Sequence, residues 1–427
     1  MAATSFITGL SAWALRLPSA LAGIVAIWSI YRLGCLLKDK RLGLLSGWML
    51  LTSFYFIFWA RTSSADMLNM AGALFAVYWY FDKKSQPSFF NYAIFFLILA
   101  VTSLCKGLGG AIIPLIAVFP DLMMNKEWKR HLRLSVLPAL VPAAVIYFIP
   151  FWASAHFGGE EYGQSGLRLV YQENILRYFQ PFDHKGPIYT YFIYLPVYLL
   201  PWTLFFIPAL ISLKGRWKAM STESKWIIWA VVLLFMFFTI SGSRRNYYVL
   251  PIVPFAILMT ADWILASTQE FAKRNILAGK MAIAFLGVFF LSFSLLQPFY
   301  YAKGGTQGFA DKLKTEVAKQ KPWNEWTFVM LDPESKTRFY LGLSPQVKNY
   351  GMHGQPRNQL TEDKIFQVWP ILKDKNKNTV FITRKMYEPM LKNALKDFEV
   401  VDAGPSLGER LLKIENKNAP VAFIPRV

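Results

Sequence analysis

Four polar segments of this chain hold the side chains best suited to chemistry: Ala60–Asp66, Cys105–Gly107, Gly158–Pro187 and Ser241–Tyr248. They combine carboxylates, which accept protons or bind cations, with arginines, whose guanidinium groups match phosphate oxygens through two parallel hydrogen bonds. All four segments fall on the same side of the membrane that the hydropathy pattern predicts. The sequence therefore predicts one polar surface at which an anion is bound or a proton is transferred.

Asp66 lies at the boundary where one predicted helix leaves the membrane and the next begins, five residues after Arg61. In one interpretation its carboxylate accepts a proton, binds a cation or fixes an arginine. In the other, Asp66 is the N-cap of the helix that begins at Met67 and accepts hydrogen bonds from free backbone N–H groups. Position alone leaves both interpretations open.

Arg244 and Arg245 are adjacent, precede Tyr247, and lie on the side of the membrane where positive charge is disfavoured. A lipid phosphate or pyrophosphate is a natural ligand for such a pair, and the alternative is that both arginines extend to lipid headgroups. Lys106, a lone basic residue at the tip of a predicted hairpin, has the same two interpretations: phosphate binding or extension to the headgroups.

His184 lies near the end of the long outer loop, in the segment Asp183–Pro187. A histidine there acts as an acid or base, as a metal ligand or as a phosphate partner, or is simply solvated. No Cys/His spacing resembles a zinc site, so no metal ligand is predicted, although the acids and the histidine of this loop leave a divalent metal open. Two cysteines, Cys35 and Cys105, do not indicate a disulfide framework.

The composition is that of a membrane protein. Of 427 residues, 54% are hydrophobic and 17% aromatic, whereas soluble domains are about 45–50% apolar. The net charge of +20 is attributed to lysines and arginines in cytoplasmic loops and beside anionic headgroups. Nucleic acid is not predicted as a partner, because no basic stripe alternates with exposed aromatic residues on a soluble fold.

Apolar runs long enough to approach the roughly 20 residues that a spanning helix needs predict about ten transmembrane helices. The predicted spans are 15–37, 42–59, 67–81, 89–104, 107–120, 134–153, 191–213, 226–240, 247–267 and 276–298.

Alternate connections between these spans carry the basic residues: 38–41, 82–84, 126–133, 214–225 and 273–274. Placing these five loops in the cytoplasm satisfies the positive-inside rule. The long loop at 154–190 and the carboxyl-terminal tail then lie outside. The first span runs from outside to inside, which predicts either a preceding helix or head-first insertion.

The character of the chain changes near residue 299, and two domains are predicted: a transmembrane domain at 1–298 and a periplasmic α/β domain at 299–427. In the second, Phe309–Gln320 and Tyr387–Lys396 are predicted helices. Short buried strands are predicted at 327–331, 379–382, 398–401 and 410–414. No Gly-rich phosphate loop or catalytic triad pattern occurs there, which predicts a supporting or acceptor-gating role.

The membrane part resembles the C-type (GT-C) membrane glycosyltransferases of the aminoarabinose transferase and protein O-mannosyltransferase group. The resemblance rests on the order and sidedness of several short segments, none of which is highly specific alone. They are Trp13–Gly23, Ala60-Arg61 with Ala65-Asp66-Met67, Glu173-Asn174 with Arg177-Tyr178, His184–Pro187 with Tyr191, Leu200-Pro201-Trp202, and Ser243–Pro251.

The resemblance implies a sugar transfer from a polyprenyl-phosphate carrier with inversion, in which a carboxylate deprotonates the acceptor and cations stabilise the departing phosphate. It implies catalytic roles for Asp66 and His184. It places Arg244, Arg245 and Tyr247 near the carrier phosphate. Arg61 and Lys106 are predicted to bind donor phosphate as well, although Lys106 has no clear counterpart in the family.

The family's principal catalytic acid lies in a first outer loop, ahead of the segment that matches Trp13–Gly23. That loop and the helix before it are not found here, and the orientation of the first span points to the same gap. The chain is therefore expected to be amino-terminally truncated, and is either inactive or reliant on Asp66.

The predicted function is transfer of a sugar from a polyprenyl-phosphate donor to a lipid A-like lipid or a protein, at the periplasmic face of the bacterial inner membrane. The alternatives are a transporter or flippase of a lipid-linked sugar, and a catalytically inactive truncated glycosyltransferase. Few ionisable residues fall within the predicted spans, which disfavours the transporter.

Overall fold

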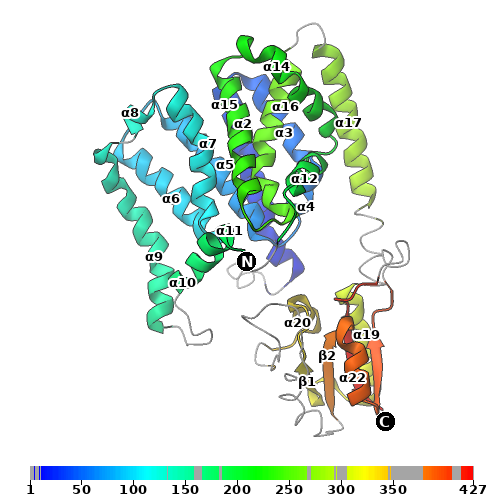
Figure 1. Cartoon of the computed structure of the whole chain (residues 1–427). Helices are drawn as coiled ribbons and strands as arrows, with labels where there is room; N and C mark the ends of the chain where they lie inside the picture. The colour runs from blue at the N-terminus through cyan, green and yellow to red at the C-terminus, as the bar shows by residue number, and fades with distance from the viewer. Residues whose placement is uncertain are drawn as a thin grey trace. The chain divides into compact units, whose positions relative to one another are not determined.

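A computed structural model of the chain describes residues 4, 9, 11–131, 133–157, 166–181, 185–266, 271–292, 295, 305–344, 347, 378–405 and 415–426. The chain divides into two compact units, Met1–Leu286 and Gly287–Val427. The first unit is helical and the second is built on a small sheet (Figure 1). The chain is thus a polytopic α-helical membrane protein with a small α/β domain, as the sequence predicts.

The helices of the first unit follow the predicted spans in order. They are α2 (Ala12–Leu37), α3 (Lys40–Leu51), α4 (Phe54–Ala60), α5 (Ala65–Lys83), α6 (Phe89–Lys106), α7 (Gly109–Met124), α8 (Trp128–His131), η1 (Leu134–Ala139), α9 (Leu140–Phe157), α10 (Gly166–Val170), η2 (Tyr171–Leu176), α11 (Arg177–Phe179), α12 (Thr190–Tyr198), α13 (Thr203–Ile211), α14 (Leu213–Arg216), η3 (Trp217–Ala219), α15 (Thr222–Ile240), η4 (Asn246–Ile252), α16 (Val253–Leu265) and α17 (Phe271–Leu291).

Among the described residues, five helices are long and apolar enough to cross a membrane, or six if the bent pair α3 and α4 counts as one span. The other predicted spans correspond to helices that are shorter, broken or less apolar. Large apolar side chains such as Ile24, Phe90 and Ile211 are exposed on the surface of this unit. Exposure of that kind suits contact with lipid.

Two predicted spans are broken in a way that the hydropathy pattern does not reveal. The helices α3 and α4 meet at a bend of 66°, where the hydroxyls of Thr52 and Ser53 donate to backbone carbonyls of α3. The helices α12 and α13 are separated at Leu199–Trp202, beside Pro201. The indole N–H of Trp202 donates to Thr52 Oγ1 over 3.0 Å, which joins the two breaks.

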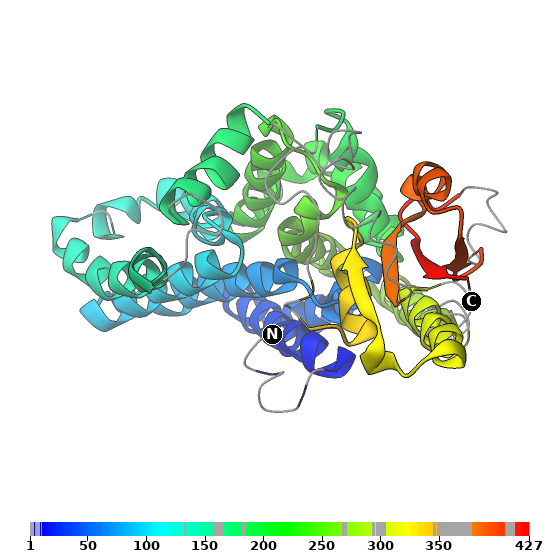
Figure 2. The same cartoon turned by 90° about the horizontal axis from the view of Figure 1, so that it is seen from below.

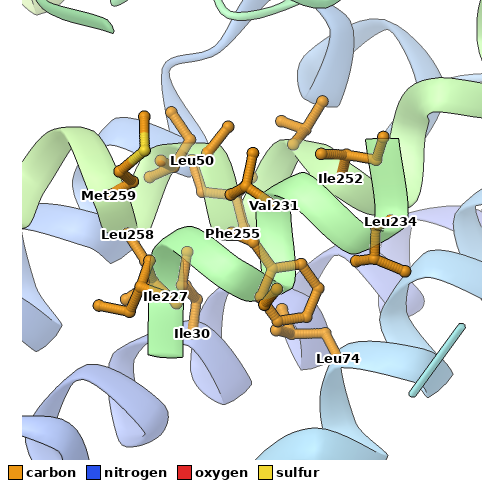
Figure 3. Packing of buried hydrophobic residues seen from close by; sticks show 14 of the residues in the cluster. Ile30, Leu50, Leu74, Ile227, Val231, Leu234, Ile252, Phe255, Leu258 and Met259 are labelled. Atoms are coloured by element: carbon orange, nitrogen blue, oxygen red, sulfur yellow. The ribbon is translucent and has the colours of Figure 1, made fainter. Parts of the chain in front are cut away.

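The core of the first unit lies where α2, α3, α5, α15 and α16 pack together. Figure 3 shows Ile30, Leu74, Val231 and Phe255 from four of these helices converging in one apolar cluster. The helix α16 is buried along nearly its whole length. Helices α6, α7 and α9 form one flank of the unit in both views (Figures 1 and 2). The resulting bundle holds the ends of α5, α6 and α15 in fixed positions.

The described part of the second unit is a four-stranded sheet with α19 (Thr306–Gln320) and α20 (Ser335–Leu341) on one face and α22 (Glu388–Ala394) on the other. Its strands β1 (Thr327–Met330), β2 (Thr379–Arg384), β3 (Phe398–Asp402) and β4 (Pro420–Pro425) lie in the order β1-β2-β4-β3. Only β1 and β2 are parallel. The helix α19 packs against one face through Phe309 and Leu313, and α22 packs against the other through Leu391.

Three predicted strands and both predicted helices of this unit are confirmed. The strand predicted at 410–414 lies outside the described residues. The strand β4 was not predicted, because the prolines at its two ends, Pro420 and Pro425, are typical of loops. Proline is tolerated at the first position of a strand, and the residues between them are fully buried.

Candidate active site

Asp66 and Lys106 form an ion pair between the start of α5 and the end of α6. The interpretation of Asp66 as the N-cap of its helix is wrong, since the cap is Ser64, which accepts a hydrogen bond from the Asp66 N–H over 3.0 Å. The Ser64 hydroxyl also donates to Asp66 Oδ2 over 2.7 Å. Asp66 thus lies in the first turn of α5, where the helix dipole favours a negative charge.

The turn after Lys106 has a backbone conformation that only glycine populates readily. Gly107 has φ 87° and ψ −173°, and a side chain at this position would overlap the carboxamide of Asn174. Asn174 Oδ1 accepts a hydrogen bond from the Leu108 N–H over 2.8 Å, and Asn174 Nδ2 donates to the Val170 carbonyl over 2.8 Å. The outer helix η2 therefore holds the turn that presents Lys106.

Two tyrosine rings lie beside Lys106, and a second cation, Arg245, contacts one of them. Lys106 Nζ lies 5.1 Å from the ring centre of Tyr247 and 5.3 Å from that of Tyr248. The guanidinium carbon of Arg245 lies 5.6 Å from the Tyr247 ring centre, and Arg245 donates to the Tyr247 hydroxyl over 2.6 Å. Two cations thus share one tyrosine ring, an arrangement stabilised by the negative faces of the ring.

Arg244 differs from its neighbour because its guanidinium binds backbone carbonyls. It donates to Thr239 O over 3.1 and 2.9 Å and to Gly186 O over 2.8 Å. These bonds join the end of α15 to the described end of the outer loop, where Lys185 and Ser243 also form a backbone bridge. This geometry favours a positioning role for Arg244.

Of the two remaining predicted site residues, Arg61 is described by the structure and His184 is not. Arg61 is exposed and caps the end of α4. His184 lies outside the described residues, together with Asp183 and the acids Glu160 and Glu161. In the described part of the chain, no group of three or more His, Cys, Asp or Glu side chains is placed to hold a metal ion.

A cavity of about 500 Å³ opens beside the ion pair. Its polar wall contains the pair itself, together with residues from the outer helices and from the loop after α15. Its lining residues are Asp66, Asn69, Lys106, Leu108, Gly109, Ile112, Ile113, Glu173, Asn174, Ile175, Arg177, Tyr178, Phe179, Phe237, Phe238, Ser241, Ser243, Tyr248 and Pro251. The lining therefore combines charged and polar side chains with apolar ones.

The helices η2 and α11 contribute two further polar contacts beside the cavity. Glu173 and Arg177 form an ion pair across one turn of helix. The Tyr178 hydroxyl donates to the Phe237 carbonyl over 2.8 Å, and burial raises the pKa of this phenol. Tyr178 therefore stays neutral and fixes α11 against the end of α15.

Several cavity residues were not predicted as site residues, in particular Asn69, Asn174, Arg177 and Ser243. Asn69 follows Asp66 by three residues and so shares its helix face, which is a pattern visible in the sequence. Asn174 and Arg177 lie in a segment that carried the family resemblance without an assigned role. Ser243 had no sequence signal beyond its place beside the two arginines.

Comparison with known proteins gives concordant matches in sequence and in fold. A family described as dolichyl-phosphate-mannose-protein mannosyltransferase matches residues 1–153. The undecaprenyl phosphate-alpha-4-amino-4-deoxy-L-arabinose arabinosyl transferase of Pectobacterium atrosepticum is 25% identical over 302 residues, covering 67% of this chain and 52% of that protein. The protein of the same name from Shewanella sediminis is 27% identical over 215 residues, covering 50% and 37%. The chain thus spans about half, or less, of the length of these relatives.

Among solved structures, ArnT from Cupriavidus metallidurans bound to undecaprenyl phosphate superposes with a TM-score of 0.67 at 15% identity, covering 99% of this chain and 85% of that one. The apo form of the same protein gives a TM-score of 0.65. The helical unit and the small sheet domain therefore have the fold of the C-type membrane glycosyltransferases. The chain is an integral membrane protein, and it is similar in sequence to aminoarabinosyl transferases and, over residues 1–153, to the mannosyltransferase family.

Proposed function

We propose that this protein transfers a sugar from a polyprenyl-phosphate-linked donor to a lipid A-like lipid or a protein acceptor. The observation that carries the proposal is the Asp66–Lys106 ion pair on the wall of a cavity of about 500 Å³. A base and a phosphate-binding cation are the two groups that such a transfer needs. The names of the relatives, which are undecaprenyl phosphate aminoarabinosyl transferases, support the same substrate class.

Lys106 and Arg245 are the cations that would receive the carrier phosphate. Both lie against the ring of Tyr247, where a dianionic or monoanionic phosphate would meet two positive charges in a partly desolvated site. Such charges act most strongly on the negative charge that develops as the phosphate leaves. The apolar lining of the cavity, including Phe237 and Phe238, suits the hydrocarbon of the carrier.

Asp66 is the proposed general base. Its carboxylate takes the proton of the acceptor hydroxyl, whose oxygen forms the new bond to the anomeric carbon of the sugar. The bond between that carbon and the phosphate oxygen breaks, and the phosphate leaves with the electron pair. Because phosphate competes with Asp66 for Lys106, donor binding weakens the ion pair and frees the carboxylate to accept the proton.

Arg244 and the Gly107 turn have positioning roles in this proposal. Arg244 fixes the loop that carries Arg245 through its three bonds to backbone carbonyls. Asn174 and Gly107 fix the end of α6 that carries Lys106. Arg245→Gln is expected to weaken donor binding at nearly unchanged melting temperature, whereas Arg244→Gln lowers the melting temperature.

The proposed sidedness follows from the basic loops. The positive-inside rule places the loops after α2, α5 and α7 in the cytoplasm. The ends of α4, α6 and α15, and with them the cavity, then face the periplasm. The site would meet donor and acceptor at the outer leaflet of the inner membrane.

Transfer of a radiolabelled sugar by the purified protein tests the proposal. The protein in lipid nanodiscs is given polyprenyl-phosphate donors carrying an aminopentose, a pentose or a hexose, with extracted membrane glycolipid and membrane protein as acceptors. Transfer is expected with one of these donors. Asp66→Asn is expected to slow it by about 100-fold or more, the usual contribution of a general base.

Asp82→Asn is the matched control. Asp82 lies at the other end of α5 and pairs with Lys83 over 2.8 Å, and its side chain is 18% exposed against 13% for Asp66. This variant is expected to keep wild-type activity. The proposed function would be contradicted if Asp66→Asn kept wild-type transfer, or if the wild type transferred no sugar. It would also be contradicted if the protein moved intact donor across vesicle membranes without transferring the sugar.

A further inference from the structure

Two residues that line the cavity each have a buried oxygen for which the described residues provide no hydrogen-bond partner. Asn69 and Ser243 are 6% and 3% exposed, and both line the cavity. Among the described residues, no group forms a hydrogen bond with Asn69 Oδ1 or with Ser243 Oγ. A buried polar atom without a partner destabilises a fold, so a ligand that supplies the missing hydrogen bond is favoured at both positions.

Both side chains lie close in sequence to charged residues of the site, Asn69 to Asp66 and Ser243 to Arg245. Asn69 is one turn after Asp66 on α5 and shares its helix face. Ser243 lies in the loop that carries Arg245, and its backbone is held by the bridge to Lys185 and by the Ser241 hydroxyl, which donates to the Ser243 carbonyl over 3.1 Å. A rotation of either side chain toward the cavity that both residues line would bring the buried oxygen to a ligand.

The chemistry of Asn69 Oδ1 favours a hydroxyl or an amine over a phosphate, and Ser243 Oγ is compatible with that choice. A carboxamide oxygen only accepts hydrogen bonds, so Asn69 Oδ1 requires a donor such as a hydroxyl or an ammonium group. Phosphate oxygens are acceptors and do not match it. Ser243 Oγ both donates and accepts, as a sugar hydroxyl does.

We propose that Asn69 and Ser243 form a sugar-binding subsite, in which they bind hydroxyl or amine groups of a saccharide next to the Asp66–Lys106 pair. This inference rests on the proposed function. The saccharide is either the sugar of the donor or a sugar of a glycolipid acceptor, since both carry the same groups. In either case the phosphate binds at Lys106 and Arg245, and the sugar binds at Asn69 and Ser243.

Binding of two lipids to wild type and variants tests the subsite. The dissociation constants of polyprenyl phosphate and of the same lipid carrying the sugar are measured in nanodiscs for Asn69→Leu and Ser243→Ala. If the donor sugar is bound there, each variant weakens binding of the sugar-bearing lipid by about 3- to 10-fold, the effect of one lost hydrogen bond. Binding of plain polyprenyl phosphate stays unchanged.

Ser103→Ala is the matched control. The Ser103 hydroxyl is also buried and without a partner in the described structure, at 4% exposure, but it does not line the cavity. Its removal is expected to leave both dissociation constants unchanged. Ser243→Ala removes a single oxygen, so it remains informative if Asn69→Leu folds poorly.

A second arm distinguishes the two sources of the sugar. If the donor constants are unchanged in Asn69→Leu and Ser243→Ala but the KM for a glycolipid acceptor rises by about 3- to 10-fold, the subsite binds the acceptor. Unchanged donor binding together with an unchanged acceptor KM overturns the subsite.

Sugar-selective binding is measured without turnover, so a wild type that binds the sugar-bearing lipid selectively but transfers nothing refutes the proposed function alone. A wild type that binds both lipids equally and whose acceptor KM is insensitive to the variants refutes the subsite alone, and binding of neither lipid refutes both.

Discussion

Replacing Gly107 with alanine tests whether the turn after α6 is held by its backbone conformation and by Asn174. With φ 87° and ψ −173°, this residue lies in a region that is essentially limited to glycine, and a side chain there costs about 1–3 kcal/mol. The new Cβ would overlap Asn174 Oδ1, so Asn174 must move and the bond from the Leu108 N–H is lost, at about 1 kcal/mol. The expected loss of stability is about 2–4 kcal/mol.

The assay is thermal unfolding of the purified protein in detergent, followed by tryptophan fluorescence. At about 2 °C per kcal/mol for a unit of this size, the apparent melting temperature of Gly107→Ala is expected to fall by about 4–8 °C. Gly109→Ala is the control, because its Cβ would meet only Ile113 Cδ1, at 3.7 Å. Gly109 begins α7, where alanine is at least as favourable as glycine.

The double variant Gly107→Ala/Asn174→Ala separates the two contributions. Because the first substitution already breaks the bond from the Leu108 N–H to Asn174, the double variant is expected to lose less stability than the sum of the two single variants. The prediction is refuted if Gly107→Ala has the same melting temperature as Gly109→Ala. It is also refuted if the stability losses of Gly107→Ala and Asn174→Ala simply add in the double variant.

Two further predictions concern other parts of the first unit. Burial lowers the pKa of His131, at the end of α8. Its pKa in the unfolded chain is about 6.5, so the unfolded chain binds more protons below that pH, and the stability of the wild type should fall as the pH falls through about 6.5. His131→Gln should lessen this fall in a comparison of melting temperatures at pH 7.5 and 5.5, and equal pH dependence in both proteins would contradict it. Thr52→Val leaves the indole N–H of the fully buried Trp202 without its partner and should cost about 1–3 kcal/mol. The control is Thr260→Val, because the Thr260 hydroxyl donates to a backbone carbonyl of its own helix. This variant should lose less stability than Thr52→Val, and equal losses would show that the Trp202 bond is unimportant.

The sequence predicts the membrane unit well because spanning helices depend on local hydropathy. It predicts poorly where helices are broken, as between α3 and α4 and between α12 and α13. The bend at Thr52 and Ser53 depends on hydroxyls bonding back to carbonyls of α3 and on Trp202, which is 150 residues away in the chain. The strand β4 was overlooked because its burial comes from pairing with β2 and β3, which no local pattern reports.

Part of the candidate site, likewise, can be predicted from the sequence, and part of it cannot. Asp66 was identified from its position at a helix boundary and from the family resemblance, but its partner Lys106 was left as an isolated cation, because a contact between two helix ends is decided by packing. Arg244 and Arg245 are adjacent residues of the same type, so the sequence treats them alike. The fold directs one to backbone carbonyls and the other to the Tyr247 ring.

The position of the carrier phosphate tests the central claim most directly. A structure determined with bound polyprenyl phosphate is predicted to show phosphate oxygens within about 2.7–3.2 Å of Lys106 Nζ and of the Arg245 guanidinium. The Lys106–Asp66 contact should be lengthened in that structure. Phosphate bound at the opposite end of the unit, beside Lys84 and Arg130, with the Asp66–Lys106 pair intact, would contradict the account.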